Sequence, residues 1–128
     1  MSYYYSKKVL GSFEEIIEKV TGNLKKEGFG IITQIDVTKT MKEKLNVDFK
    51  KYRILGACNP PYAYKALEAE DKIGVLLPCN VIVQDNASGE IEVACVNPTV
   101  SMQNVNNPAL ESVAKEIQDK LHKAVDLV

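Results

Sequence analysis

The sequence is poor in the residues that hold metal ions. It has a single histidine, His122, and three cysteines, and it contains no Cys-x-x-Cys or His-x-x-x-His pair. A structural zinc site takes four Cys or His ligands at close spacing, so no metal site is predicted. His122 falls roughly opposite the apolar stripe of the last predicted helix, and we expect it in solvent. That position removes the usual partner for Ser–His or Cys–His catalysis, and no catalytic residue is assigned.

Other absences narrow the partners and the location. No run of about 18 apolar residues is present, so no transmembrane helix is predicted, and residues 1–8 lack the apolar segment of a signal peptide. The formal net charge is −1 and basic residues alternate with acidic ones, so neither nucleic acid nor an anionic membrane is expected as a partner. No glycine-rich phosphate loop occurs, and no cofactor is indicated. The odd number of cysteines argues against a disulfide scaffold, and we expect a cytosolic protein.

What is present is an ordinary globular composition, with 45% hydrophobic and 26% charged residues in 128. This length fits one domain, residues 1–128. The spacing of apolar residues predicts the order β-α-β-(α)-β-α-β-β-α. The predicted strands are residues 3–9, 29–37, 50–57, 73–83 (interrupted by Pro78) and 90–96; helices follow Ser12, Asn59 and Asn107, and residues 38–47 form a short helix or an irregular connection with Met41 and Leu45 as its apolar contacts.

The helices and strands together predict an α+β fold. Ser12 and Glu15 match a capping box, and Asn59 and Asn107 each precede a proline that suits a first helical turn. Two long helices with one apolar stripe each would cover one face of a mainly antiparallel sheet. Residues 73–83 are apolar on both sides, so we expect the second face to be partly buried, most simply in a homodimer.

Two short segments concentrate the residue types that build sites, Cys58-Asn59-Pro60-Pro61 and Leu77-Pro78-Cys79. Both lie where a predicted strand breaks, and loops at strand ends are where a rigid scaffold presents functional groups. Unpaired backbone donors at a helix start would favour a Cys58 thiolate. The alternative is that these cysteines are small buried hydrophobic residues, which is what we expect of Cys95 on the core side of its strand.

Two stretches of the chain resemble the domain-of-unknown-function 302 family. They are Tyr52-Arg53-Ile54-Leu55-Gly56-Ala57-Cys58-Asn59-Pro60, followed by Ala63 and Leu67, and Gly74-Val75-Leu76-Leu77-Pro78-Cys79-Asn80-Val81-Ile82-Val83. The resemblance implies a stand-alone bacterial or archaeal α+β domain of β-α-β(4)-α order, a dimer, and no established activity. Cys58, Pro60, Pro78 and Cys79 fall on the most characteristic positions of the family motif, and Cys95 does not.

Three hypotheses about function follow. The first is a protein that binds a small molecule or uses a thiol, at a site formed by Cys58, Asn59, Pro60, Tyr62, Pro78 and Cys79. The second is a non-catalytic homodimeric interaction module whose sheet face is the functional surface. The third is a metal-dependent enzyme, which the scarcity of ligand residues disfavours. No reaction or ligand identity follows from the residues.

Overall fold

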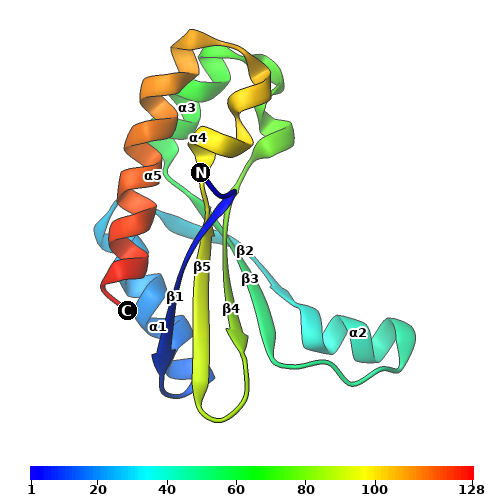
Figure 1. Cartoon of the computed structure of the whole chain (residues 1–128). Helices are drawn as coiled ribbons and strands as arrows, with labels where there is room; N and C mark the ends of the chain where they lie inside the picture. The colour runs from blue at the N-terminus through cyan, green and yellow to red at the C-terminus, as the bar shows by residue number, and fades with distance from the viewer.

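The computed structural model describes residues 1–128 and contains a single five-stranded sheet (Figure 1). Its strand order is β1-β5-β4-β3-β2, and every neighbouring pair is antiparallel. The strands are β1 (Tyr4–Leu10), β2 (Gly30–Asp36), β3 (Tyr52–Cys58), β4 (Cys79–Asp85) and β5 (Glu90–Val96). The predicted α+β class with a mainly antiparallel sheet is confirmed.

Two long helices cover one face of this sheet, shorter helices lie beyond one end of it, and one helix projects away (Figure 1). They are α1 (Phe13–Lys26), α2 (Val37–Leu45), α3 (Pro60–Ala69), α4 (Pro98–Ser101) and α5 (Glu111–Asp126), with 3₁₀ turns η1 (Asp71–Leu76), η2 (Gln103–Val105) and η3 (Pro108–Leu110). The two long amphipathic helices, α1 and α5, cover one sheet face as predicted, and α2 projects away from the rest. No helix is long and apolar enough to cross a bilayer.

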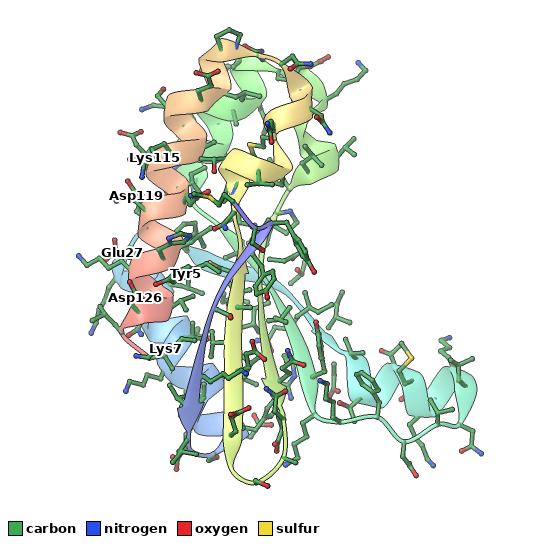
Figure 2. The ribbon with its side chains drawn as sticks, in the orientation of Figure 1. Tyr5, Lys7, Glu27, Lys115, Asp119 and Asp126 are labelled. Carbon is green, nitrogen blue, oxygen red and sulfur yellow. The ribbon has the colours of Figure 1, made fainter.

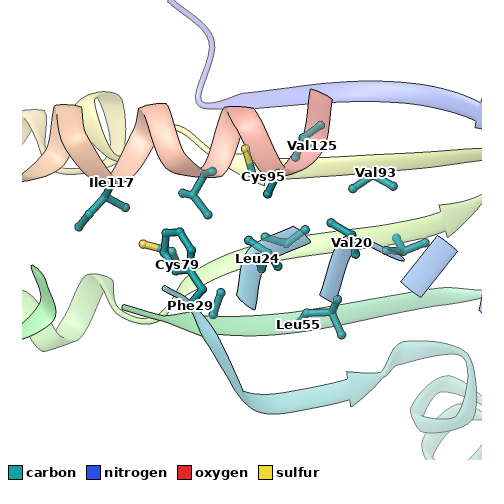
Figure 3. Close-up of a cluster of buried hydrophobic side chains, with 14 of the residues drawn as sticks. Val20, Leu24, Phe29, Leu55, Cys79, Val93, Cys95, Ile117 and Val125 are labelled. Carbon is teal, nitrogen blue, oxygen red and sulfur yellow. The ribbon is translucent and has the colours of Figure 1, made fainter. Parts of the chain in front are cut away.

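The core lies between that covered face and the two long helices (Figure 3). Leu55 of β3 pairs with Val81 of β4, and their side chains are fully buried with Val20 and Leu24 of α1. Burying one such side chain stabilises the fold by about 1.5–3 kcal/mol. Cys95, also in this cluster, is 1% exposed, which confirms its predicted place in the core.

The ends of α1 follow the predicted local signals. The Ser12 hydroxyl accepts the Glu15 N–H at 3.4 Å, which satisfies a donor that has no partner within the helix. Gly28 adopts φ +92°, and the Phe29 N–H then reaches the Leu24 carbonyl at 2.9 Å. A residue with a side chain would be strained in that conformation, so the glycine determines where the helix ends.

One predicted strand is half wrong. The segment before Pro78 forms the 3₁₀ turn η1, and β4 begins only at Cys79. Within η1, Ile73 is buried but Val75 is 84% exposed, so the apolar run does not line a sheet face. A short apolar run has no period of its own, and the proline, which cannot donate a ladder hydrogen bond, ends the strand pairing there.

The second sheet face has no helix over it (Figure 1). Strand alternation directs Tyr4, Ile54, Ile82 and Ala94 to this uncovered face. A groove of 500 Å³ runs along it, lined by Tyr3, Tyr4, Tyr52, Asn80, Ile82, Gln84, Glu92, Ala94, Cys95 and Val96. The helix α2 buries none of its residues. The prediction that Leu45 makes an apolar contact is therefore wrong, because Leu45 is 66% exposed.

Candidate functional site

An apolar cavity of 320 Å³ opens at the end of the sheet where β3 ends and β4 begins. Side chains from the sheet, α3 and α5 surround it. Its lining consists of Phe29, Ile32, Ala57, Cys58, Asn59, Ala63, Ala66, Leu67, Leu77, Pro78, Cys79 and Ile117. Figure 3 shows Phe29, Cys79 and Ile117 together at one end of the core. The cavity is therefore an extension of the core toward the surface.

The two sequence segments singled out above meet at this cavity. Ala57 of β3 pairs directly with Cys79 of β4, so the segment after β3 and the segment before β4 are held side by side. Four of the six candidate residues, Cys58, Asn59, Pro78 and Cys79, border the cavity. The two segments are far apart in the sequence, and they come together only because β3 pairs with β4.

The other two candidates, Pro60 and Tyr62, do not border the cavity. Pro60 is exposed at the start of α3. Tyr62 is half-buried against the core, and the ammonium groups of Lys65 and Lys120 lie 5.4 and 5.9 Å from the centroid of its ring. Such contacts with an aromatic face stabilise the position of the ring. Tyr62 therefore packs the helix start.

Asn59 does not cap α3 through its side chain, contrary to expectation. It occupies the N-cap position, but its amide instead donates to the Glu27 carbonyl at the end of α1, at 3.1 Å. Pro60 and Pro61 fill the first two helical positions and have no N–H to offer, so the Tyr62 N–H is the one usual cap donor that remains, and the Asn59 side chain does not bond it. The same two prolines remove two of the backbone donors that were expected at this helix start.

Gly56 allows one wall of the cavity to approach the sheet closely. A Cβ built on Gly56 would lie 2.9 Å from Cγ of Pro78 and would overlap Oγ1 of Thr33. Pro78, joined to Leu77 by a cis peptide bond, therefore packs on the strand only because position 56 has no side chain. This glycine, adjacent to the predicted motif, was not recognised from sequence as a site residue.

The three thiols differ in access. All are free; Cys58 is half-exposed and Cys79 is only 5% exposed. Burial raises the pKa of Cys79 to about 11, and the nearby Cys58 adds to that rise. Burial likewise raises the pKa of Cys95 to about 12, with a further contribution from Cys79. Loss of hydration disfavours the thiolate, so both buried cysteines stay protonated at neutral pH.

Sequence reasoning did not identify the helix and loop residues that complete the cavity, among them Phe29, Ala66 and Ile117. Ala66 and Ile117 fall on the apolar stripes of their helices. Such a stripe indicates which side faces inward, but a filled core and an open cavity produce the same pattern. No signal in the sequence distinguishes them.

A second polar cluster lies at the end of α5, where His122 is not in solvent as predicted. Its ring stacks on Tyr5 at 3.9 Å, and its Nε2 lies 2.6 Å from Oδ1 of Asn97. The Asn97 amide donates to the Ser2 carbonyl at 2.8 Å, which leaves Oδ1 as the acceptor and gives the proton to Nε2 of His122. The apolar stripe of a helix gives no information about contacts with an edge strand far away in the sequence. The position of the His122 ring against Tyr5 therefore could not be predicted from the sequence.

This cluster ties β1 to the end of α5 (Figure 2). The Tyr5 hydroxyl donates to Asp126, and this bond is the main cause of the raised pKa of Tyr5. Partial burial lowers the pKa of His122, against the opposing charge of Asp126. The Lys7 ammonium donates to the carbonyls of Asp126 and Val128 at 2.8 and 2.9 Å, which suits a cation at a helix C-terminus. No cavity borders this cluster, so we assign it a structural role.

No group of three or more His, Cys, Asp or Glu side chains is placed to hold a metal ion.

Comparison with known proteins gives a family and similar solved structures. A family model described as "Domain of unknown function DUF302" matches residues 5–128. The crystal structure of an uncharacterized conserved protein DUF302 from Bacillus stearothermophilus superposes with a TM-score of 0.91, at 32% sequence identity and over 98% of both chains. No curated protein matches the chain.

Proposed function

The chain belongs to the DUF302 family, and from this premise we propose that it binds a small, neutral, apolar molecule in the cavity at the end of β3 and β4. The observation that carries the proposal is the lining, in which ten of twelve residues are hydrophobic. Ligand sites are mostly apolar clefts of about 300–1,000 Å³, so a 320 Å³ cavity suits a fragment-sized ligand.

The polar groups at the cavity support a neutral ligand. The Asn59 amide is already bonded to the Glu27 carbonyl, and the pKa of Cys79, raised to about 11, keeps that thiol uncharged. No Lys, Arg, Asp or Glu lines the cavity. A charged ligand would therefore lose its hydration without gaining a partner, which is costly.

The entrance extends the apolar surface outward. Ile32 and Leu67 both line the cavity and are 61% and 42% exposed. A ligand longer than the cavity would cover them and gain further apolar burial. Cys58 is the one half-exposed thiol beside this entrance, so any thiol-dependent step would use its sulfur.

The test is an NMR titration of methyl-labelled protein with indole and with 1-octanol as neutral apolar probes. The expected result is saturable shifts at the methyl groups of Ala57, Ala66 and Ile117, which line the cavity. Ala63→Leu places three more carbons in the cavity and should abolish these shifts. Ala109→Leu, at an exposed position, is the matched control and should leave them unchanged. Shifts that persist in Ala63→Leu would refute the proposal.

A homodimer formed through the uncovered sheet face is the second candidate function. It is favoured by that face itself, which carries the apolar groove with its three tyrosines and has no helix over it. A five-stranded face of seven-residue strands covers roughly 550 Å², from strand spacings of about 4.8 Å and rises of about 3.3 Å. Sedimentation at micromolar concentration decides, because a monomer there would eliminate this candidate.

A further inference from the structure

The segment between β2 and β3 extends from the molecule without a core of its own (Figure 1). We call residues 37–51, which comprise α2 and the extended chain that leads into β3, the arm. No residue from Gly30 through Ile54 is buried. The arm nevertheless carries Leu45, Val47 and Phe49, which are 66%, 45% and 44% exposed. An exposed apolar patch of this kind marks an interaction surface.

Polar contacts at the base and the tip shape the arm, together with the approach of the Phe49 ring to the Tyr52 ring at 6.1 Å. The Thr38 hydroxyl donates to the Lys50 carbonyl at 2.6 Å and accepts the Tyr52 N–H at 3.0 Å, which closes the base of the arm. Lys42 pairs with Asp48 at 3.3 Å across its tip. Exposed ion pairs contribute little to stability, about 0–1 kcal/mol each. The shape of the arm depends instead on the helix α2 and the two Thr38 hydrogen bonds, and its apolar side chains are available to a partner.

We propose that the arm lies across the uncovered sheet face of a second copy of the chain, and that the second copy's arm does the same in return. This inference rests on the proposed homodimer and specifies how the two copies meet. One chain carries both complementary surfaces, so a two-fold arrangement satisfies both at once and closes the assembly.

Charge supports the second copy as the occupant. The arm holds five lysines against two acidic residues, and Lys44 and Lys50 take part in no ion pair. On the uncovered face of β5, the Glu90 and Glu92 carboxylates accept hydrogen bonds only from the neutral amides of Asn86 and Gln84. Lys8 of β1 stands opposite Glu92 but forms no ion pair with it, and the two glutamates outnumber this lysine. Unpaired charges of opposite sign on two surfaces steer association and determine which surfaces meet.

The area also suits a dimer. The arm contains a nine-residue helix, about 14 Å long, and the chain after Asn46 returns beside this helix to β3. The arm can therefore reach a little over half-way along a seven-residue strand, which is about 23 Å long. If each arm covered half of a face of roughly 550 Å², the two arms and two faces together would bury roughly 1,100 Å². That meets the approximate threshold of 1,000 Å² for a specific interface. The tyrosine-lined groove of 500 Å³ on this face provides room for the apolar side chains of the arm.

A charge-swap experiment tests whether each copy of the chain places its arm on the uncovered sheet face of the other, an arrangement that we call the arm exchange. The arm variant carries Lys44→Glu and Lys50→Glu, and the face variant carries Glu90→Lys and Glu92→Lys. Each variant alone brings like charges together at both contacts, so its dimer should dissociate about tenfold more readily or worse in sedimentation at low salt. Mixed in equal amounts, the two variants restore opposite charges at both contacts, and the dimer should return to nearly wild-type strength.

Each alternative arrangement predicts a different outcome. Contact between the two faces alone would leave the arm variant dimeric, and contact between the two arms alone would leave the face variant dimeric. Either result overturns the exchange, as does a mixture that stays dissociated. A monomeric wild-type protein would overturn both the homodimer and the arm exchange. The three results above would overturn the arm exchange alone, so the two failures can be told apart. Circular dichroism of both variants confirms that they fold.

A pair of neutral variants checks the apolar part of the contact. Leu45→Ser with Phe49→Ser removes apolar surface from both arms of the dimer and should weaken it by about 100-fold or more. Val75→Ser removes a side chain that is 84% exposed in η1, away from the arm, and should leave the dimer unchanged. Equal dimerisation of the arm variant and the wild type would refute the proposal.

Discussion

Replacing Gly56 by alanine should both destabilise the fold and change the shape of the cavity wall. The added Cβ would lie 2.9 Å from Cγ of Pro78 and would overlap Oγ1 of Thr33. Thr33 is exposed and its hydroxyl can rotate away. The Pro78 ring is rigid, so the contact with it must be relieved by movement of the segment that leads into β4.

The magnitude follows from two opposing effects. Inserting a carbon into a packed site costs about 1–3 kcal/mol, and alanine recovers about 0.4–1 kcal/mol because it restricts the unfolded chain. The net loss is then about 1–2 kcal/mol. With an unfolding entropy of about 2.1 cal/mol/K per residue, a chain of 128 residues should lose about 4–7 °C in Tm.

The assay is thermal and urea unfolding of Gly56→Ala followed by circular dichroism. Gly74→Ala is the matched control, because nothing lies within 4 Å of a Cβ built there, and it should not be destabilised. Thr33→Ala in the Gly56→Ala background should recover only part of the loss, since the contact with Pro78 remains. Wild-type stability of Gly56→Ala would refute the reasoning.

The same substitution connects the fold to the proposed function. Pro78 borders the cavity, so its displacement by a Cβ at position 56 changes the wall that the ligand would contact. Binding of indole should therefore weaken in Gly56→Ala and stay unchanged in Gly74→Ala. Unaltered binding in a destabilised Gly56→Ala would mean that the movement occurs elsewhere.

Three further predictions concern the thiols, α1 and the pH dependence of stability. In native protein at pH 8, Ellman's reagent should label Cys58 alone, because the pKa values of the other two cysteines are raised to about 11 and about 12; rapid labelling of three thiols would contradict their burial. Gly22→Ala, in α1 with open space around its Cβ, should stabilise the fold by about 0.5–1 kcal/mol in urea unfolding, and a loss would show an unrecognised contact. The lowered pKa of His122 means that its contribution to stability is present above pH 6.5 and declines as the pH falls below that value; His122→Phe should therefore show a smaller loss of Tm between pH 7.5 and 5 than the wild type, and equal losses would exclude this effect.

Local patterns in the sequence were sufficient for the fold class. The stripes of α1 and α5, the Ser12 cap and the hairpin between β4 and β5 all lie within a few residues of the chain. Periodicity therefore predicted that two helices would cover one face of an antiparallel sheet. It also directed attention to Cys58 and Cys79, because each stands beside a proline at a break in a strand.

Long-range contacts decided the rest. The Asn59 amide bonds a carbonyl 32 positions away, and His122 bonds Asn97, 25 positions away; no local pattern encodes such partners. The run before Pro78 was read as a strand because a short apolar segment has no distinguishing period. The exposure of the arm was equally hidden, since Leu45, Val47 and Phe49 are residue types that are as common in a packed core as on an open surface. The sequence by itself determined which faces are apolar, and the tertiary structure decided which of them are covered, which enclose a cavity and which remain open to a partner.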